Sequence, residues 1–219
     1  MENLKTAITR LRQELDKSLP ENARNLLRRS VQRVTESGIV DSAAGVGDRF
    51  PQFSLPNAGG EAVSSEELLA KGPLVVTFFR GGWCPYCNLE LRAYQAILPE
   101  ILQRGASVIA ISPQLPDESL YTAAKANLGF EVLSDTGNSL AEHLGLVFEL
   151  PPNLIALYRS MGADLERVNG NMRWTLPLPA TYVLAADGVI AEAFISADYT
   201  VRMEPAEVLA IIDNLNGTN

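Results

Sequence analysis

Cysteine and histidine are scarce in this chain of 219 residues, which contains two cysteines and one histidine. A small secreted protein held together by disulfides needs more cysteines at wider spacings, so that class is excluded. A zinc site built on the two cysteines needs two further ligands, and only His143 remains to supply one. The two cysteines, Cys84 and Cys87, lie three positions apart, so the sequence favours thiol chemistry over a metal site.

Long apolar runs and a surplus of basic residues are also absent. No stretch approaches the ~20 apolar residues that a membrane-spanning helix needs, and the charged N-terminus MENLKTAITRLRQELD shows no secretory signal. The formal net charge of −8 argues against nucleic acid as a partner, because binding phosphates requires a basic surface. We therefore expect a cytoplasmic protein with no membrane or nucleic-acid partner, in a compartment where thiols stay reduced.

The N-terminal segment 1–45 predicts a helical extension in the form of a hairpin. Apolar residues recur at helical spacing at Leu4, Ile8, Leu11, Leu15 and Leu19. Pro20 interrupts this pattern, and a second helical pattern runs on to Gly38, a suitable C-terminal stop. Such a pair has to bury its apolar stripe on its own body or on a second subunit. We slightly favour a contact in a homodimer.

The segment 46–219 shows the rhythm of one α/β domain. Strand-like and helical patterns alternate, the strands at 74–79, 107–112 and 130–133 and the helices at 86–102, 116–126 and 139–144. This alternation predicts a mostly parallel sheet covered by helices. A β-hairpin at 180–195 and a helix at 205–215 close the chain. Residues 151–176 lack strand character and are interpreted as an insertion.

Cys84 and Cys87 lie at the predicted start of a helix, in the stretch GGWCPYC that follows an apolar strand. At a helix N-terminus the unpaired N–H groups and the helix dipole favour a thiolate and lower its pKa from about 8.5. The spacing of three puts both sulfurs on one side of the turn. One thiolate can then attack a peroxide or a disulfide, and its neighbour can resolve the product. A pair of inert buried thiols is the alternative.

Several stretches between Val46 and Asp213 resemble the thioredoxin fold and, within it, peroxiredoxin-like proteins of the alkyl hydroperoxide reductase type. They are GDRFPQFSLPN, LVVTFFRGGWCPYCNLELRAY, SVIAISPQ, FEVLSDTGNSLAEHLGL and LPLPATYVLAADGVI. The resemblance implies an α/β thioredoxin-like fold with a mixed central sheet. It also implies an antioxidant oxidoreductase, a thiol-dependent peroxidase that takes hydroperoxides and is recycled by a thioredoxin- or glutaredoxin-like reductant, with no metal or organic cofactor.

The cysteines fall differently on the motifs of the two related families. In the peroxiredoxin pattern Pro-x-x-x-Thr-x-x-Cys, the proline position is Arg80 here, the threonine position is Cys84 and the cysteine position is Cys87. The resemblance therefore implies that Cys87 attacks the peroxide and that Cys84 then forms the disulfide with the oxidised Cys87. In thioredoxins the first cysteine, here Cys84, is instead the attacking thiol. The resemblance thus favours Cys87 and leaves the order open.

The supporting residues also combine the two families. Where peroxiredoxins place a peroxide-activating arginine, this chain has Pro179. Thioredoxins also have a proline at this position, and with a cis peptide bond Pro179 would shape the groove that faces the sulfurs. Arg80 is then the nearest cation able to stabilise a departing oxygen, with a surface ion pair as the alternative. Glu90 matches the family's glutamate but is expected to be a solvated or helix-capping carboxylate. Trp83 is expected to pack against the loop and to shape substrate approach.

Three functions therefore stay open for this sequence. The first is a peroxidase with a redox-active Cys84–Cys87 disulfide. The second is a thiol–disulfide oxidoreductase with little peroxidase activity, and the third is a non-enzymatic redox-sensing or interaction module.

Overall fold

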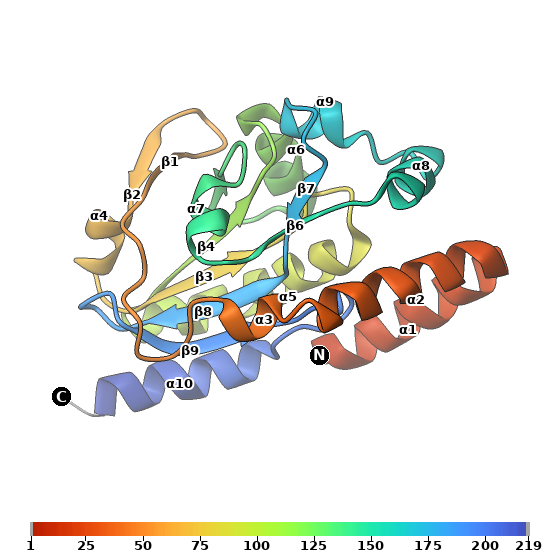
Figure 1. Cartoon of the computed structure of the whole chain (residues 1–219). Helices are drawn as coiled ribbons and strands as arrows, with labels where there is room; N and C mark the ends of the chain where they lie inside the picture. Colours follow the sequence, from red (N-terminus) through yellow and green to blue (C-terminus); the bar gives the residue numbers. More distant parts are fainter. Residues whose placement is uncertain (1, 218–219) are drawn as a thin grey trace.

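The computed structural model describes residues 2–217 and has a mixed five-stranded sheet at its centre, in the order β5-β4-β3-β8-β9 (Figure 1). The strands are β3 (Leu74–Phe78), β4 (Ser107–Ser112), β5 (Glu131–Ser134), β8 (Ala180–Leu184) and β9 (Ile190–Ile195). Strands β3, β4 and β5 are parallel, whereas β8 runs antiparallel to β3 and β9 antiparallel to β8. The predicted α/β fold with a mixed central sheet is confirmed.

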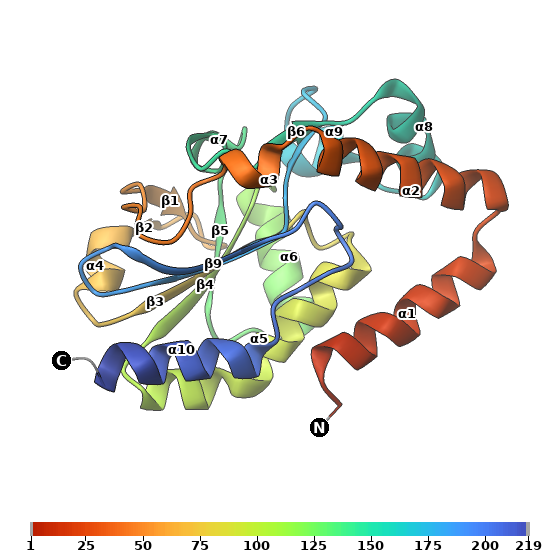
Figure 2. The same ribbon diagram turned by 60° about the horizontal axis from the view of Figure 1, so that its bottom comes forward.

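One face of the sheet is covered by the helices that connect the parallel strands. Helices α5 (Pro85–Gln103) and α6 (Pro116–Ala126) follow β3 and β4, and α10 (Pro205–Gly217) lies beside α5 (Figure 2). Val75 and Val183 of the sheet pack there against Tyr94 of α5 and Ile212 of α10. Helix α5 continues through Pro99 without a break.

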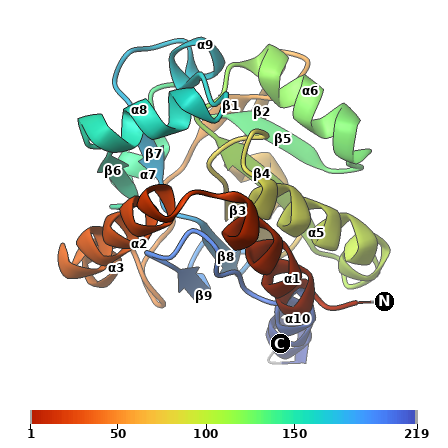
Figure 3. The same cartoon turned by 90° about the vertical axis from the view of Figure 1, so that its right-hand side faces the viewer.

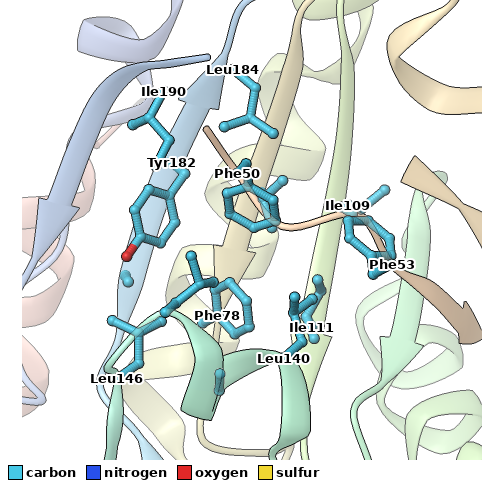
Figure 4. Close-up of a cluster of buried hydrophobic side chains, with 14 of the residues drawn as sticks. Phe50, Phe53, Phe78, Ile109, Ile111, Leu140, Leu146, Tyr182, Leu184 and Ile190 are labelled. Carbon is cyan, nitrogen blue, oxygen red and sulfur yellow. The ribbon is translucent and has the colours of Figure 1, made fainter. Parts of the chain in front are cut away.

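The opposite face of the sheet carries the largest apolar cluster (Figure 4). It is covered by the short helices α3 (Ile39–Ser42), α4 (Ser65–Leu69) and α7 (Ser139–His143) and flanked by the hairpin of β1 (Ser54–Pro56) and β2 (Ala62–Ser64). Tyr182 makes edge-on ring contacts with Phe50 at 5.4 Å and with Phe78 at 6.3 Å. Because both faces are buried, the central strands are continuous apolar runs rather than alternating ones.

Residues 147–177 form a separate flap above the sheet. Strand β6 (Val147–Glu149) pairs antiparallel with β7 (Thr175–Pro177), and helices α8 (Pro152–Ser160) and α9 (Leu165–Asn169) lie between them. The prediction that 151–176 contains no strand is therefore wrong at its C-terminal end. A three-residue strand that ends in proline is too short to show the alternation that marks a strand.

The N-terminal helices α1 (Leu4–Ser18) and α2 (Glu21–Glu36) form a V whose two arms rest on different parts of the body (Figures 2 and 3). Helix α1 packs on α5, and α2 packs on α8. Leu4 and Ile8 are buried in one cluster with Cys84 and Cys87. The stripe thus packs at least partly within the chain, where the sequence slightly favoured a second subunit. The boundaries 1–45 and 46–219, and the insertion, remain predictions.

No helix within residues 2–217 is both long and apolar enough to cross a membrane.

Candidate active site

The loop after β3 carries both cysteines to the N-terminus of α5. Cys84 is the residue that caps α5, and its backbone N–H donates to the carbonyl of Gly81 at 3.0 Å. The backbone N–H of Gly82 donates to Gln114 Oε1 at 2.7 Å, which ties the loop to the segment after β4. A Cβ at Gly82 would collide with the hydroxyl of Thr122 on α6. The glycine therefore allows the loop to pass close to α6 and sets the position of the thiols.

Both cysteines are free thiols and both are buried, Cys84 with 1% of its surface exposed and Cys87 with none. Each sulfur faces a different arginine. The Nη1 atom of Arg80 lies 4.0 Å from the Sγ of Cys84, and the Nη2 of Arg202 donates to the Sγ of Cys87 at 3.2 Å. Two buried guanidinium groups thus face the sulfurs, so this site stabilises a thiolate.

Arg80 is 2% exposed and lies among aromatic rings. Its Nη2 donates to the hydroxyl of Tyr158, and its guanidinium lies 4.9 Å from the ring centre of Trp83 and 4.5 Å from that of Tyr199. Such cation–π contacts hold a guanidinium without neutralising its charge. Within residues 2–217 no carboxylate forms an ion pair with Arg80. The alternative of a surface ion pair for Arg80 is therefore wrong.

Glu90 and Arg202 form an ion pair beneath the cysteines. Their Oε2 and Nε atoms are 2.6 Å apart, and both side chains are 1% exposed. The expectation of a solvated or capping carboxylate for Glu90 is wrong, because α5 turns this position inward, toward the loop before α10. Sequence reasoning missed Arg202 altogether. The available signal was that it is the sole Lys or Arg after Arg173, in a long acidic and apolar segment.

The surroundings separate the pKa values of the two thiols. Burial by itself would raise the pKa of Cys84, but a hydrogen bond from Cys87 and the charges of Arg80 and Arg202 lower it to about 5. Burial raises the pKa of Cys87, and the adjacent Cys84 raises it further. Burial also raises the pKa of Glu90, to about 7, against the opposing charge of Arg202. These shifts favour the thiolate form of Cys84 and the thiol form of Cys87.

A cavity of about 280 Å³ reaches Cys84. Its lining includes Arg80, Cys84, Tyr158 and Tyr199, and the N-terminal hairpin contributes the apolar residues Leu15, Leu19, Leu27 and Val31. Cys87 is not among the lining residues. A small molecule in this cavity therefore meets Cys84 and not Cys87.

The remaining residues singled out from the sequence lie around this site or away from it. Trp83 is half-buried on the cavity wall, with its ring centre 5.5 Å from that of Tyr158. Pro179 is buried just before β8, outside the cavity, and its peptide bond is trans like every other among residues 2–217. His143 is exposed on α7. No group of three His, Cys, Asp or Glu side chains in the part of the chain described here could hold a metal ion.

Comparisons with known proteins give the same picture of the fold. The model of the AhpC/TSA family matches residues 46–193. The chain is 28% identical to chloroplastic peroxiredoxin Q of Triticum aestivum over 184 residues, which cover 84% of this chain and 74% of that protein. It is 30% identical to peroxiredoxin Bcp of Escherichia coli K12 over 100 residues, which cover 46% of this chain and 64% of that one.

Solved structures extend the likeness to the three-dimensional fold. The crystal structure of peroxidoxin BcpB from Mycobacterium tuberculosis matches with a TM-score of 0.61 and 20% identity, over 78% of this chain and 97% of that one. The matched region of the AhpC/TSA family begins after the N-terminal hairpin. The hairpin that covers the cavity is therefore outside the part that defines the family.

Proposed function

The chain belongs to the AhpC/TSA family and is a thiol-dependent peroxidase of the peroxiredoxin type, and we propose that Cys84 is its attacking sulfur and Cys87 its resolving sulfur. This order reverses the one that the family motif favours. The observation that carries it is the position of Cys84, which lines the cavity beside Arg80, whereas Cys87 does not line it. The lowered pKa of Cys84 adds support, since the thiolate is the nucleophile.

The first step is attack of the Cys84 thiolate on the outer oxygen of a hydroperoxide, ROOH. An S–O bond forms, the O–O bond breaks, and the departing alkoxide takes up a proton to leave as ROH. Arg80 lies 4.0 Å from the sulfur and stabilises the negative charge that moves from sulfur to oxygen. Because its guanidinium is held by rings rather than by a carboxylate, its charge is available to this oxygen.

The second step joins the two sulfurs. Cys87 attacks the sulfenic acid on Cys84, an S–S bond forms, and hydroxide leaves with the Cys87 proton as water. Arg202 contacts the Cys87 sulfur at 3.2 Å and favours negative charge on it as the proton departs. A thioredoxin- or glutaredoxin-like dithiol then reduces the disulfide by exchange.

The burial of both sulfurs supports a peroxidase over the two alternatives. A hydroperoxide is small enough to enter the cavity that Cys84 lines, whereas a protein disulfide would have to reach a sulfur that is 1% exposed. The same burial requires that the first turn of α5 or the N-terminal hairpin moves before a protein reductant reacts with the oxidised pair.

The test is peroxide consumption driven by thioredoxin, thioredoxin reductase and NADPH. We expect turnover by the wild-type protein and none by the Cys84→Ser/Cys87→Ser variant. If the wild-type protein reduces a small model disulfide at a substantial rate but consumes no peroxide, the protein is a thiol–disulfide oxidoreductase and the proposal is wrong. If it does neither, the non-enzymatic alternative holds.

A further inference from the structure

We propose that the N-terminal hairpin is the substrate-binding wall of this enzyme and that Arg12 and Arg28 on it select organic hydroperoxides that carry a carboxylate. This inference rests on the proposed peroxidase function and specifies its substrate class. The hairpin residues precede the region matched by the AhpC/TSA family, 46–193, so this wall lies outside the part of the chain that the family model describes.

The size of the cavity indicates a substrate larger than hydrogen peroxide. A volume of about 280 Å³ is near the lower limit of small-molecule pockets, ~300 Å³. Since one water molecule occupies about 30 Å³, the cavity has room for about nine groups of that size. Hydrogen peroxide fills a small part of this space, whereas a hydroperoxide with a compact apolar body fills most of it.

The hairpin lines this cavity with apolar side chains. At its N-terminal end Leu4 is buried against the body, but Leu15, Leu19 and Leu27 remain only partly buried and face the cavity. The ring of Tyr158 lines the same cavity, and Leu27 packs against the apolar cluster that contains it. Because burying apolar surface is favourable, an apolar ligand body against these side chains gains binding free energy that water does not.

The charged residues of the wall indicate the second part of the substrate. Arg12 and Arg28 line the cavity, and within residues 2–217 neither donates a hydrogen bond or forms an ion pair. Arg24 is different, since its Nη1 donates to the carbonyls of Asp16 and Leu19 and so fixes the turn of the hairpin. Two unpaired guanidinium groups beside an apolar cavity match a ligand with a carboxylate at one end.

Other charges around the cavity do not remove this preference. The carboxylate of Asp198 lines it too, but its Oδ1 already accepts from the backbone and the hydroxyl of Thr200. Asp16 of α1 also lines the cavity and is exposed, as Arg12 and Arg28 are, but the lining residues comprise four arginines against these two aspartates, so the balance of charge stays positive. The segment up to Glu36 contains eight Lys and Arg against five Asp and Glu, although the whole chain has a net charge of −8. The basic part of an acidic protein therefore lies over its reactive thiol.

The experiment compares three substrates that share one reacting group: cumene hydroperoxide, its para-carboxylate and the methyl ester of that acid. We expect kcat/KM for the acid to exceed that for the ester at least tenfold at low ionic strength and to approach it as salt is added. The Arg12→Gln/Arg28→Gln variant should bring the acid-to-ester ratio to about one. The matched control, Arg10→Gln/Arg29→Gln, removes the same charge from the same helices outside the cavity and should keep the ratio.

Binding provides a readout that does not depend on turnover. The alcohol that corresponds to the para-carboxylate cannot react, and calorimetry should show that it binds the reduced wild-type protein more tightly than its methyl ester does. Equal binding of the two alcohols, or an unchanged acid-to-ester ratio in the Arg12→Gln/Arg28→Gln variant, would overturn this inference and leave the peroxidase proposal standing. If no hydroperoxide is reduced at all, the proposed function fails, and the binding comparison alone decides whether the wall selects carboxylates.

Discussion

Replacing Arg80 by glutamine should raise the pKa of Cys84 sharply. The Nη1 atom of Arg80 lies 4.0 Å from the sulfur, and two unit charges at that distance interact by about 4 kcal/mol at an effective dielectric constant of 20. Since one pKa unit corresponds to 1.36 kcal/mol, the loss of this charge raises the pKa of Cys84 by up to ~3 units. The pKa would then move from about 5 to ~8.

The assay is the rate of alkylation of Cys84 by iodoacetamide as a function of pH, read by mass spectrometry, together with thiolate absorbance. At pH 6.5 the wild-type thiol is almost fully ionised, whereas a pKa of ~8 leaves about 3% as thiolate, so alkylation should slow about 30-fold. Arg80→Lys keeps the charge and should recover most of the rate.

The control for this measurement is a variant that removes an arginine far from the cysteines. Arg104→Gln removes an arginine that pairs with Asp213 at the far end of α5, so it should leave the pKa of Cys84 unchanged. A pKa of Cys84 in Arg80→Gln that stays within one unit of the wild-type value would refute the role assigned to Arg80.

Three further predictions follow from the site. Because the pKa of Cys84 is about 5, kcat/KM for peroxide should be constant near neutral pH and fall tenfold per unit below pH 5; a midpoint near 8 would contradict the thiolate assignment. Folding raises the pKa of Glu90 from 4.5 to about 7, so its contribution to stability is present below pH 4.5 and lost as pH rises through 7. Between pH 4.5 and 8 the unfolding free energy of the wild-type protein, measured with urea, should therefore fall by about 3 kcal/mol relative to that of Glu90→Gln. A difference between the two proteins that stays the same across this pH range would refute the prediction. Gly82→Ala should lower kcat/KM about 100-fold by displacing the cysteine loop, whereas Gly45→Ala, which has open space for a Cβ, should not; equal activities would show that the loop tolerates the side chain.

Local patterns in the sequence were sufficient to predict the strand, the loop and the helix that position the cysteines. The buried apolar run of β3, the glycines after it and Pro85 at the first position of α5 are signals carried by neighbouring residues. They predict a strand, a tight loop and a helix, and these place Cys84 at a helix N-terminus. The alternation of strands and helices likewise predicts the parallel part of the sheet.

The electrostatics of the site could not be predicted in the same way. Arg202 contacts a cysteine 115 positions away, from an irregular loop that no periodic pattern marks. Charged residues are usually exposed, which favours solvated positions for Arg80 and Glu90, but each is buried because its partner comes from a distant element. The amphipathic pattern of α1 and α2 also shows an apolar stripe without showing what that stripe covers.

The central claim is that Cys84, and not Cys87, meets the peroxide first. The most direct test adds one equivalent of hydrogen peroxide to the Cys87→Ser and Cys84→Ser variants and traps sulfenic acid with dimedone for mass spectrometry. The proposed order predicts rapid trapping on Cys84 in Cys87→Ser and oxidation of Cys87 no faster than a free thiol in Cys84→Ser. Rapid trapping on Cys87 with little on Cys84 would contradict it and restore the order that the family motif favours.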